Sequence, residues 1–183
     1  MHEWNHRILL VVGLVLVGSL GYVTLAEGAG PKKRSRKIDA CFSPGGNCED
    51  RILEEIGAAS QQIRVQMYLF TSKPIADALI AAKKRGVKVQ VILDKSQEKG
   101  TYGKWPVLRR DGVEIFFDRE HETANNKVIL IDDHTVITGS YNFTRAAEEK
   151  NAENIVIIND EALCSKYLEN FEKHKEHAKK PGK

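Results

Sequence analysis

The sequence has 183 residues, of which 42% are hydrophobic and 29% are charged, and its formal net charge is only +3. This length suits one globular domain with its own core and one additional segment. The small net charge excludes any conclusion about partners from the charge of the whole molecule. Two local basic regions, 32–37 and 173–183, can attract phosphates or anionic lipids, or can serve only as a membrane flank and a solvated tail.

The first part of the chain contains an uncharged stretch at residues 8–26, which is about long enough to cross a bilayer as a helix. Basic residues follow it in the linker 27–37, whereas only Arg7 precedes it. By the positive-inside rule, this asymmetry favours an uncleaved membrane anchor with the bulk of the chain on the cytoplasmic side. The "TLA" that ends at Ala26 leaves a cleaved signal peptide as the alternative, with a periplasmic or secreted protein as its consequence.

The remainder of the chain alternates between helical and extended patterns. We predict a flank at 1–7, the anchor or signal segment at 8–26, the basic linker at 27–37, one domain at 38–175 and a basic tail at 176–183. The domain is predicted to contain helices at Asp50–Ser60, Lys73–Arg85, within 104–112 and at Glu161–Lys175, and six strands at Ile63–Phe70, Val87–Asp94, Val113–Asp118, Lys127–Asp132, Thr135–Ser140 and Asn154–Asn159.

Helices that are interleaved with strands predict an α/β fold with a mixed β-sheet and helices on both of its faces. Pro74 is tolerated in the first turn of the second helix, and Gly86 ends that helix. The sequence shows no internal repeat and no second domain.

The three cysteines are Cys41, Cys48 and Cys164. They form no CxxC motif, and no histidines stand at zinc-ligand spacing, so a structural zinc site is not expected. Cys41 and Cys48 flank a Pro-Gly-Gly turn. They can form a disulfide in an oxidising compartment, or remain small core residues in a reducing one.

Polar residues gather at the ends of two neighbouring predicted strands, in "NNKVILID" and "GSYNFT". Alternation places Asn125 and Lys127 on one face, and Ser140 and Asn142 on one face if that strand continues. Gly139 lets the backbone approach a ligand closely. The lysine, serine and asparagine side chains are all donors that suit phosphate oxygens, so their joint spacing indicates a phosphate site, although each feature alone is more often structural.

Two acidic residues accompany these donors. Asp132 lies five residues after the lysine and therefore points to the other face, as an orienting or structural acid. Glu153 begins the next strand, where it can bind a neighbouring donor. We expect neither a cofactor nor a catalytic metal, because no cluster of acids or histidines has ligand spacing.

These residues resemble the HxKx4D…GSxN motif of the phospholipase D superfamily. The stretch reads Asn125-x-Lys127-x4-Asp132, followed by Gly139-Ser140-x-Asn142. The similarity extends from about Cys41 to Phe171 through "FSPGG", "IRVQMYLFTS", "ALIAAKKRGVKVQVILD" and "TGSYNFTRAAEEKNAEN". These segments are similar to the single-motif branch of the superfamily, which contains the bacterial Nuc-type endonucleases and the mitochondrial cardiolipin hydrolase (Zucchini) group.

The resemblance implies a metal-independent phosphodiesterase that works as a homodimer, with two motifs facing each other across a two-fold axis. One histidine attacks phosphorus to form a phosphohistidine, and the other protonates the leaving oxygen and then activates water. By position, Lys127, Ser140 and Asn142 hold the phosphoryl oxygens, and Glu153 orients the histidine across the site.

The sequence departs from the motif at the nucleophile, because the family histidine falls on Asn125. A side-chain amide neither attacks phosphorus nor exchanges a proton as imidazole does, so we expect a site that binds a phosphodiester far better than it cleaves one. Three explanations stay open: an introduced substitution that traps substrate, a natural binding-only relative, or a histidine supplied from elsewhere, at His121 or His134.

Nucleic acid is the substrate expected from the small size, the likeness to Nuc-type endonucleases and the basic segments. A phospholipid such as cardiolipin is the alternative, because residues 8–26 and the basic linker would hold the site near anionic lipid. A non-catalytic phosphate-binding membrane protein is the third possibility, and Asn125 favours it.

Overall fold

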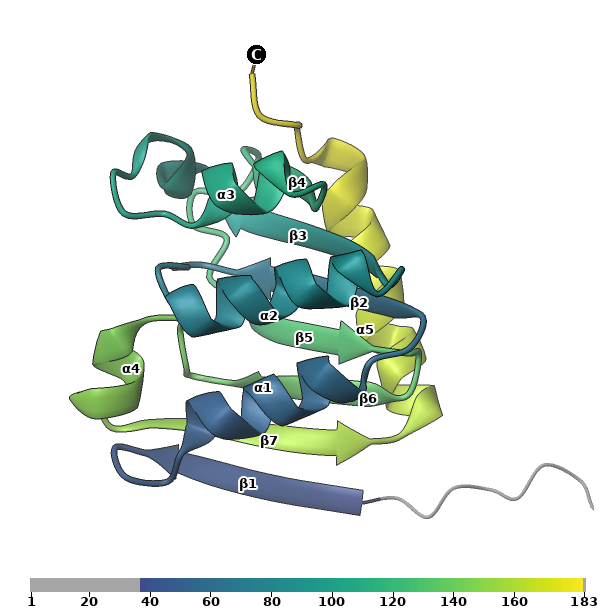
Figure 1. Ribbon diagram of the computed structural model, residues 1–183. Helices are drawn as coiled ribbons and strands as arrows, with labels where there is room; N and C mark the ends of the chain where they lie inside the picture. Colours follow the sequence, from purple (N-terminus) through teal and green to yellow (C-terminus); the bar gives the residue numbers. More distant parts are fainter. Residues whose placement is uncertain (1–36, 183) are drawn as a thin grey trace, which may run out of the picture. The chain divides into compact units, whose positions relative to one another are not determined.

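The computed structural model describes residues 37–182 (Figure 1), and within them a seven-stranded mixed sheet carries helices on both faces. The strand order is β1-β7-β6-β5-β2-β3-β4. Neighbours from β1 to β2 are antiparallel, whereas β2, β3 and β4 run parallel. The predicted α/β fold, with one mixed sheet in one domain, is confirmed. The expected segments at 1–7 and 8–26, and the linker before Lys37, lie outside the described residues.

The helices and strands agree with the sequence prediction except for three short additions. The edge strand β1, the 3-10 helix η1 and the five-residue helix α4 were not predicted. The elements are β1 (Lys37–Ser43), α1 (Cys48–Ala58), β2 (Gln62–Met67), α2 (Lys73–Lys84), β3 (Lys88–Asp94), η1 (Lys95–Lys99), α3 (Trp105–Arg110), β4 (Glu114–Asp118), β5 (Lys127–Ile131), β6 (Thr135–Gly139), α4 (Arg145–Glu149), β7 (Glu153–Asn159) and α5 (Glu161–His177).

The core has two layers because side chains of the central strands alternate between the two faces of the sheet. Ile129 and Ile131 of β5 belong to the larger apolar cluster, which α1, α2 and α3 cover. Val128 and Leu130 face the opposite way, into the smaller cluster beneath α5, where Phe171 is buried. Figure 1 shows α1 and α2 in front of the sheet and α5 behind it. Burying one such side chain contributes about 1.5–3 kcal/mol.

Local signals set the ends of α2 as the sequence indicates. The Ser72 side chain accepts a hydrogen bond from the main-chain N–H of Ile75 at 3.3 Å, and Pro74 stands in the first turn. Gly86 follows the helix with φ 96°, a conformation that glycine adopts without steric cost.

The turn between β1 and α1 is closed by a disulfide between Cys41 and Cys48, whose Cα atoms lie 5.6 Å apart. The peptide bond between Ser43 and Pro44 in this turn is cis. Of the two alternatives left open by the sequence, the structure therefore has the bridged form. Cys164, in the first turn of α5, is free and buried in the smaller apolar cluster.

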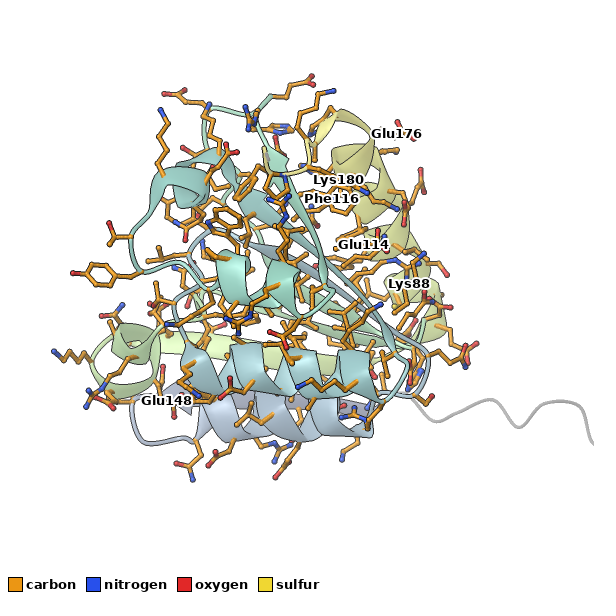
Figure 2. All side chains as sticks on the ribbon, turned by 45° about the horizontal axis from the view of Figure 1, so that its top comes forward. Lys88, Glu114, Phe116, Glu148, Glu176 and Lys180 are labelled. Carbon is orange, nitrogen blue, oxygen red and sulfur yellow. A yellow bond between two sulfur atoms is a disulfide. The ribbon has the colours of Figure 1, made fainter. Side chains whose placement is uncertain are left out.

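The C-terminal segment packs against the sheet further than the sequence predicted. Helix α5 runs to His177, and Lys179 then exchanges two main-chain hydrogen bonds with Phe117, at 2.7 and 2.9 Å. The Lys180 ammonium lies 5.8 Å from the ring centroid of Phe116 (Figure 2). Part of the expected basic tail is thus held against β4. Among the described residues, no helix combines the length and apolar character that a membrane span requires.

Candidate active site

The motif residues gather where the central strands begin or end, and we call this side of the sheet the Lys127 edge. Antiparallel neighbours form it, because the beginning of one strand lies beside the end of the next. Lys127 begins β5 and pairs with Met67 at the end of β2. Gly139 ends β6 and pairs with Ile155, two residues after Glu153 begins β7. The beginnings of β5 and β7 and the ends of β2 and β6 therefore form this edge.

Lys127 occupies the centre of the edge and is half-buried. Its ammonium donates to the main-chain oxygen of Asn125 at 3.0 Å and also contacts the side-chain oxygen of Asn125. It lies 5.2 Å from the ring centroid of Tyr68, on the segment after β2. Burial lowers the pKa of Lys127 below its ordinary value, while the negative charge of Glu153 acts in the opposite direction and favours the ammonium form. The predicted pair of Asn125 and Lys127 is thus in direct contact.

The Gly-Ser-Tyr-Asn turn is fixed by its neighbour β7. A Cβ atom on Gly139 would overlap the carbonyl group of Asn154, so only glycine fits this close approach. The next residue, Ser140, donates its main-chain N–H to that carbonyl at 3.1 Å. The Ser140 hydroxyl accepts from the main-chain N–H of Asn154 at 3.1 Å, and the side chain is exposed.

Two buried aromatic residues hold the turn from below, with the half-buried Asn142 between them in the sequence. Tyr141 and Phe143 are fully buried, and the ring of Phe143 packs edge-on against Phe70 with centroids 5.0 Å apart. The Tyr141 hydroxyl donates to Glu148 at 2.9 Å, and burial, together with Glu148, raises the pKa of that phenol. Asn142 is half-buried, and its side-chain oxygen accepts from the main-chain N–H of Leu69 at 3.3 Å.

Glu153 stands at the same edge, where its carboxylate accepts from the side-chain amide of Asn151 at 3.1 Å. The structure therefore brings five predicted site residues to this edge. Lys127 contacts Asn125 directly, Ser140 is held by Asn154 of β7, and Asn142 is held by Leu69 in the segment after β2. The set comprises Asn125, Lys127, Ser140, Asn142 and Glu153.

Asp132, by contrast, lies at the opposite end of β5, in the turn to β6, with φ 48°. Its carboxylate accepts from the main-chain N–H groups of Ser60, Gln61 and Gln62 at 2.7–2.9 Å, and from the Ser60 hydroxyl at 2.8 Å. It therefore ties the loop between α1 and β2 to the turn between β5 and β6. Of the two roles expected for Asp132, an orienting acid or a structural acid, this placement fits the structural one.

Replacing Asp132 by alanine is expected to lower the free energy of unfolding by about 2–3 kcal/mol at pH 7, because three main-chain N–H groups lose a charged acceptor. Burial raises the pKa of Asp132, but the hydrogen bonds from Gln62, Ser60 and Gln61 outweigh it and lower that pKa below its ordinary value. A lowered folded-state pKa contributes stability above the unfolded pKa of about 3.9, and this contribution is lost as the pH falls through the folded value.

The measurement is urea unfolding of the original and Asp132→Ala chains at neutral and acidic pH. The difference between them should shrink as the pH falls below about 4. Asp77→Ala is the control, because Asp77 is exposed on α2 and pairs with Lys73 on the same helix. Equal losses for the two variants at pH 7 would contradict the anchoring role.

The two histidines that were considered as replacements for the nucleophile lie elsewhere. His134 is in the turn after Asp132, at the far end of β5, and its Nδ1 lies 2.7 Å from the main-chain oxygen of Asp132. The ring of His121 contacts Asp118 at 2.9 Å. The Lys127 ammonium instead contacts Asn125 and the ring of Tyr68.

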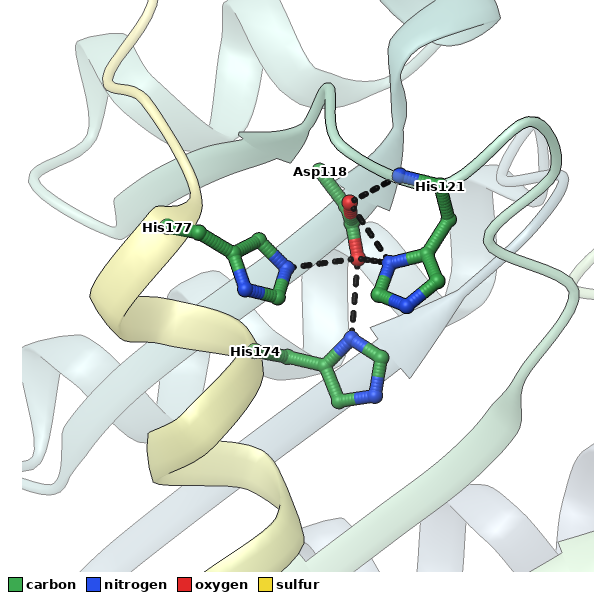
Figure 3. A group of neighbouring side chains, drawn as sticks. All are labelled: Asp118, His121, His174 and His177. Atoms are coloured by element: carbon green, nitrogen blue, oxygen red, sulfur yellow. Dashed lines mark hydrogen bonds and ion pairs between the residues drawn. The ribbon is translucent and has the colours of Figure 1, made fainter.

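A second polar cluster was missed by the sequence analysis, which expected no acids or histidines at ligand spacing. Asp118, His121, His174 and His177 meet where β4 and the last turns of α5 come together (Figure 3). The signal in the sequence is a pair of short spacings, Asp-x-x-His and His-x-x-His. They are far apart along the chain, and only the packing of α5 behind the sheet brings them together.

Taken together, the fold and these donors form an α/β domain whose chemistry suits the binding of a phosphate group. An ammonium, a hydroxyl and a side-chain amide are presented beside an acid, on half-buried or exposed positions that a ligand can reach.

Comparisons with known proteins agree with this class. Residues 52–175 match the family described as cardiolipin synthase, PLD-like domain. The chain is 42% identical over 135 residues to a phospholipase D of Rickettsia conorii. The matched region covers 74% of this chain and 68% of that protein. It is 30% identical to the mitochondrial cardiolipin hydrolase of Canis lupus familiaris, over 73% of this chain and 53% of the relative.

A solved structure gives the same result. Nuc from Salmonella typhimurium, a phospholipase D family member, matches with a TM-score of 0.76 and 34% identity, over 79% of this chain and 97% of that one. The chain belongs to the phospholipase D superfamily of phosphodiesterases.

Proposed function

We propose that this chain binds nucleic-acid phosphodiesters at the Lys127 edge of the sheet, in an endonuclease site that Asn125 has disabled. The observation that carries the proposal is the contact between Lys127 and Asn125 beside the Ser140 and Asn142 turn. The phosphate-binding donors are in place, while an amide stands where the family motif has its nucleophile.

The chemistry of the four side chains explains why binding and cleavage separate. The ammonium of Lys127, the hydroxyl of Ser140 and the amide of Asn142 need no proton transfer in order to hold phosphate oxygens. Cleavage needs a group that attacks phosphorus and a second that protonates the leaving oxygen, and Asn125 supplies neither. We propose that two chains form the complete site across a two-fold axis, as in the single-motif branch, so both nucleophile positions hold asparagine.

Nucleic acid is favoured as the ligand by the structural likeness to Nuc, which extends over 97% of that chain. A phospholipid is the second candidate, since relatives named phospholipase D reach 42% identity. The expected anchor at 8–26 would also keep the site close to lipid. The shared chemistry is a phosphodiester, so the two candidates differ in what flanks the phosphate.

The original chain is expected to bind a fluorescent single-stranded oligonucleotide without cleaving it. Lys127→Met should weaken this binding about tenfold and lower the slope of log affinity against log salt by about one, because each chain loses the ammonium that contacts phosphate. The measurement is fluorescence anisotropy at several salt concentrations, with vesicles of phosphatidylcholine or cardiolipin as competitors.

Lys88→Met is the matched control, because Lys88 is exposed and begins β3 at the other edge of the sheet, opposite Gln62. Figure 2 shows Lys88 far from Glu148 of α4, the helix next to the motif turn. Equal weakening by the two variants would reduce the binding to general charge attraction and would contradict the proposed site. Competition by cardiolipin, with no effect of Lys127→Met on oligonucleotide binding, would favour the lipid candidate.

A further inference from the structure

The cluster of Asp118, His121, His174 and His177 lies apart from the motif residues. Asp118 is the last residue of β4, and His121 follows it in the connection to β5. His174 and His177 stand one turn apart on α5, so both rings project from the same side of the helix. Figure 3 shows all three rings turned toward the Asp118 carboxylate.

The three imidazole rings converge on one oxygen atom. Asp118 Oδ2 lies 2.8 Å from Nδ1 of His174, 2.9 Å from Nδ1 of His121 and 3.2 Å from Nε2 of His177. One ligand atom from each of the four residues lies within 4.8 Å of all the others. Asp118 is fully buried, and His174 and His177 are only 16% and 24% exposed.

Hydrogen bonds account for this convergence only in part. If no ion were bound, all three nitrogens would need a proton in order to donate to the same carboxylate oxygen, which has two lone pairs. Nε2 of His177 is buried and, despite its distance of 3.2 Å from Asp118, forms no hydrogen bond of suitable geometry. A buried ring nitrogen is therefore aimed into the cluster without a hydrogen-bond partner among residues 37–182.

The same four ligand atoms, all within 4.8 Å of one another, can also surround a tetrahedral zinc ion. Nitrogen and oxygen ligands about 2.0–2.1 Å from zinc lie about 3.3 Å from one another at tetrahedral angles, close to the 2.8–3.2 Å around Asp118 Oδ2. Three imidazoles and one carboxylate are ligands that zinc prefers, whereas magnesium and calcium prefer oxygen.

The surroundings orient the ligands as supporting groups do in known metal sites. The other Asp118 oxygen, Oδ1, accepts from the main-chain N–H groups of Glu120 and His121 at 3.2 and 3.3 Å, which turns Oδ2 toward the rings. Lys95 Nζ donates to the main-chain oxygen of His121 at 2.8 Å. Glu120 also lies 3.8 Å from Nδ1 of His177, on the outer side of that ring.

We propose that Asp118, His121, His174 and His177 bind one zinc ion. Four protein ligands complete a tetrahedral shell, so the site is structural and leaves no position for a reacting water. The ion joins α5 to the connection between β4 and β5, which continues to Asn125 and Lys127. It therefore stabilises the approach to the candidate active site without taking part in phosphodiester chemistry, and the inference stands independently of the proposed function.

The test measures zinc on the full chain purified without a histidine tag. After equilibration with micromolar zinc and removal of free metal, elemental analysis should find about one zinc ion per chain. His174→Ala should weaken zinc binding at least about 100-fold in competition with a chromogenic chelator, because one of four ligands is lost. His177→Cys should retain zinc, since thiolate is also a zinc ligand.

His134→Ala is the matched control, because His134 lies outside the cluster, and it should bind zinc as the original chain does. Zinc at about 100 times its dissociation constant should raise the melting temperature of the original chain by roughly 5–10 °C, and that of His174→Ala much less. If His174→Ala fails to fold, His121→Ala replaces it, because that ring is 47% exposed. Less than about 0.1 zinc per chain, or undiminished binding by the folded ligand variant, would overturn the proposal.

Discussion

Replacing Asn125 by histidine is expected to raise the rate of phosphodiester cleavage at least about a thousandfold, because it supplies both the nucleophile and the general acid of a two-fold site. The side chain at this position already contacts the Lys127 ammonium and is exposed. An imidazole there can reach a phosphorus atom whose oxygens are held by Lys127, Ser140 and Asn142.

The measurement is nicking of plasmid and cleavage of single-stranded DNA by the Asn125→His chain in EDTA, after circular dichroism shows that the protein remains folded. Release of head group from phosphatidylcholine and cardiolipin is followed in parallel and decides between the two substrate classes. Asn126→His is the matched control, because alternation turns that side chain to the other face. An unchanged rate on every substrate, or an equal gain in the control, would contradict the role of position 125 as the nucleophile.

The original chain and the Asn125→His chain, mixed together, test whether two subunits share one site. In a random 1:1 mixture of original and Asn125→His subunits, about one dimer in four carries two histidines. If each site needs both, the activity of the mixture should be about a quarter of that of the pure histidine form. Activity that falls only to a half would mean that each histidine works alone, and would contradict the shared site.

The fold was predictable from the sequence wherever apolar residues repeat over several positions. The short apolar runs in "KVILID" and "TVITGS" predict β5 and β6, because a strand that packs against other elements on both faces is apolar at successive positions. The edge strand β1 escaped prediction because much of it is solvated: Phe42 is 67% exposed, so its sequence carries little of the burial pattern. Helix α4 spans five residues, too few for a helical period to be visible.

The candidate site, like the fold, was predictable from the sequence only in part. Asn125, Lys127, Ser140 and Asn142 follow from the motif, because the two strands that carry them are neighbours both in sequence and in the sheet. The partners of Asp132 did not follow, since Ser60, Gln61 and Gln62 reach it across about seventy positions of the chain. The separation of 56 residues between Asp118 and His174 hid the second cluster for the same reason.

In the Asn125→His chain, replacing Lys127 by methionine is expected to lower kcat about 100- to 1,000-fold, because the ammonium stabilises charge that develops on the phosphoryl oxygens. Methionine is unbranched and keeps much of the lysine volume, so the packing against Tyr68 should persist. Lys127→Arg should recover part of the rate, since it keeps the charge but changes its position.

Initial rates on a short oligonucleotide, at concentrations far above and far below KM, separate the two contributions of Lys127. A loss confined to KM would mean that the ammonium binds substrate and transition state equally, whereas a loss in kcat means that it acts mainly in the transition state. Lys88→Met in the same background should leave both constants unchanged, because Lys88 begins β3 at the other edge of the sheet. If Lys127→Met kept kcat within a few-fold, the chemistry would have to lie away from the edge formed by β2, β5, β6 and β7. The gain from Asn125→His would then need another phosphate-binding group to explain it.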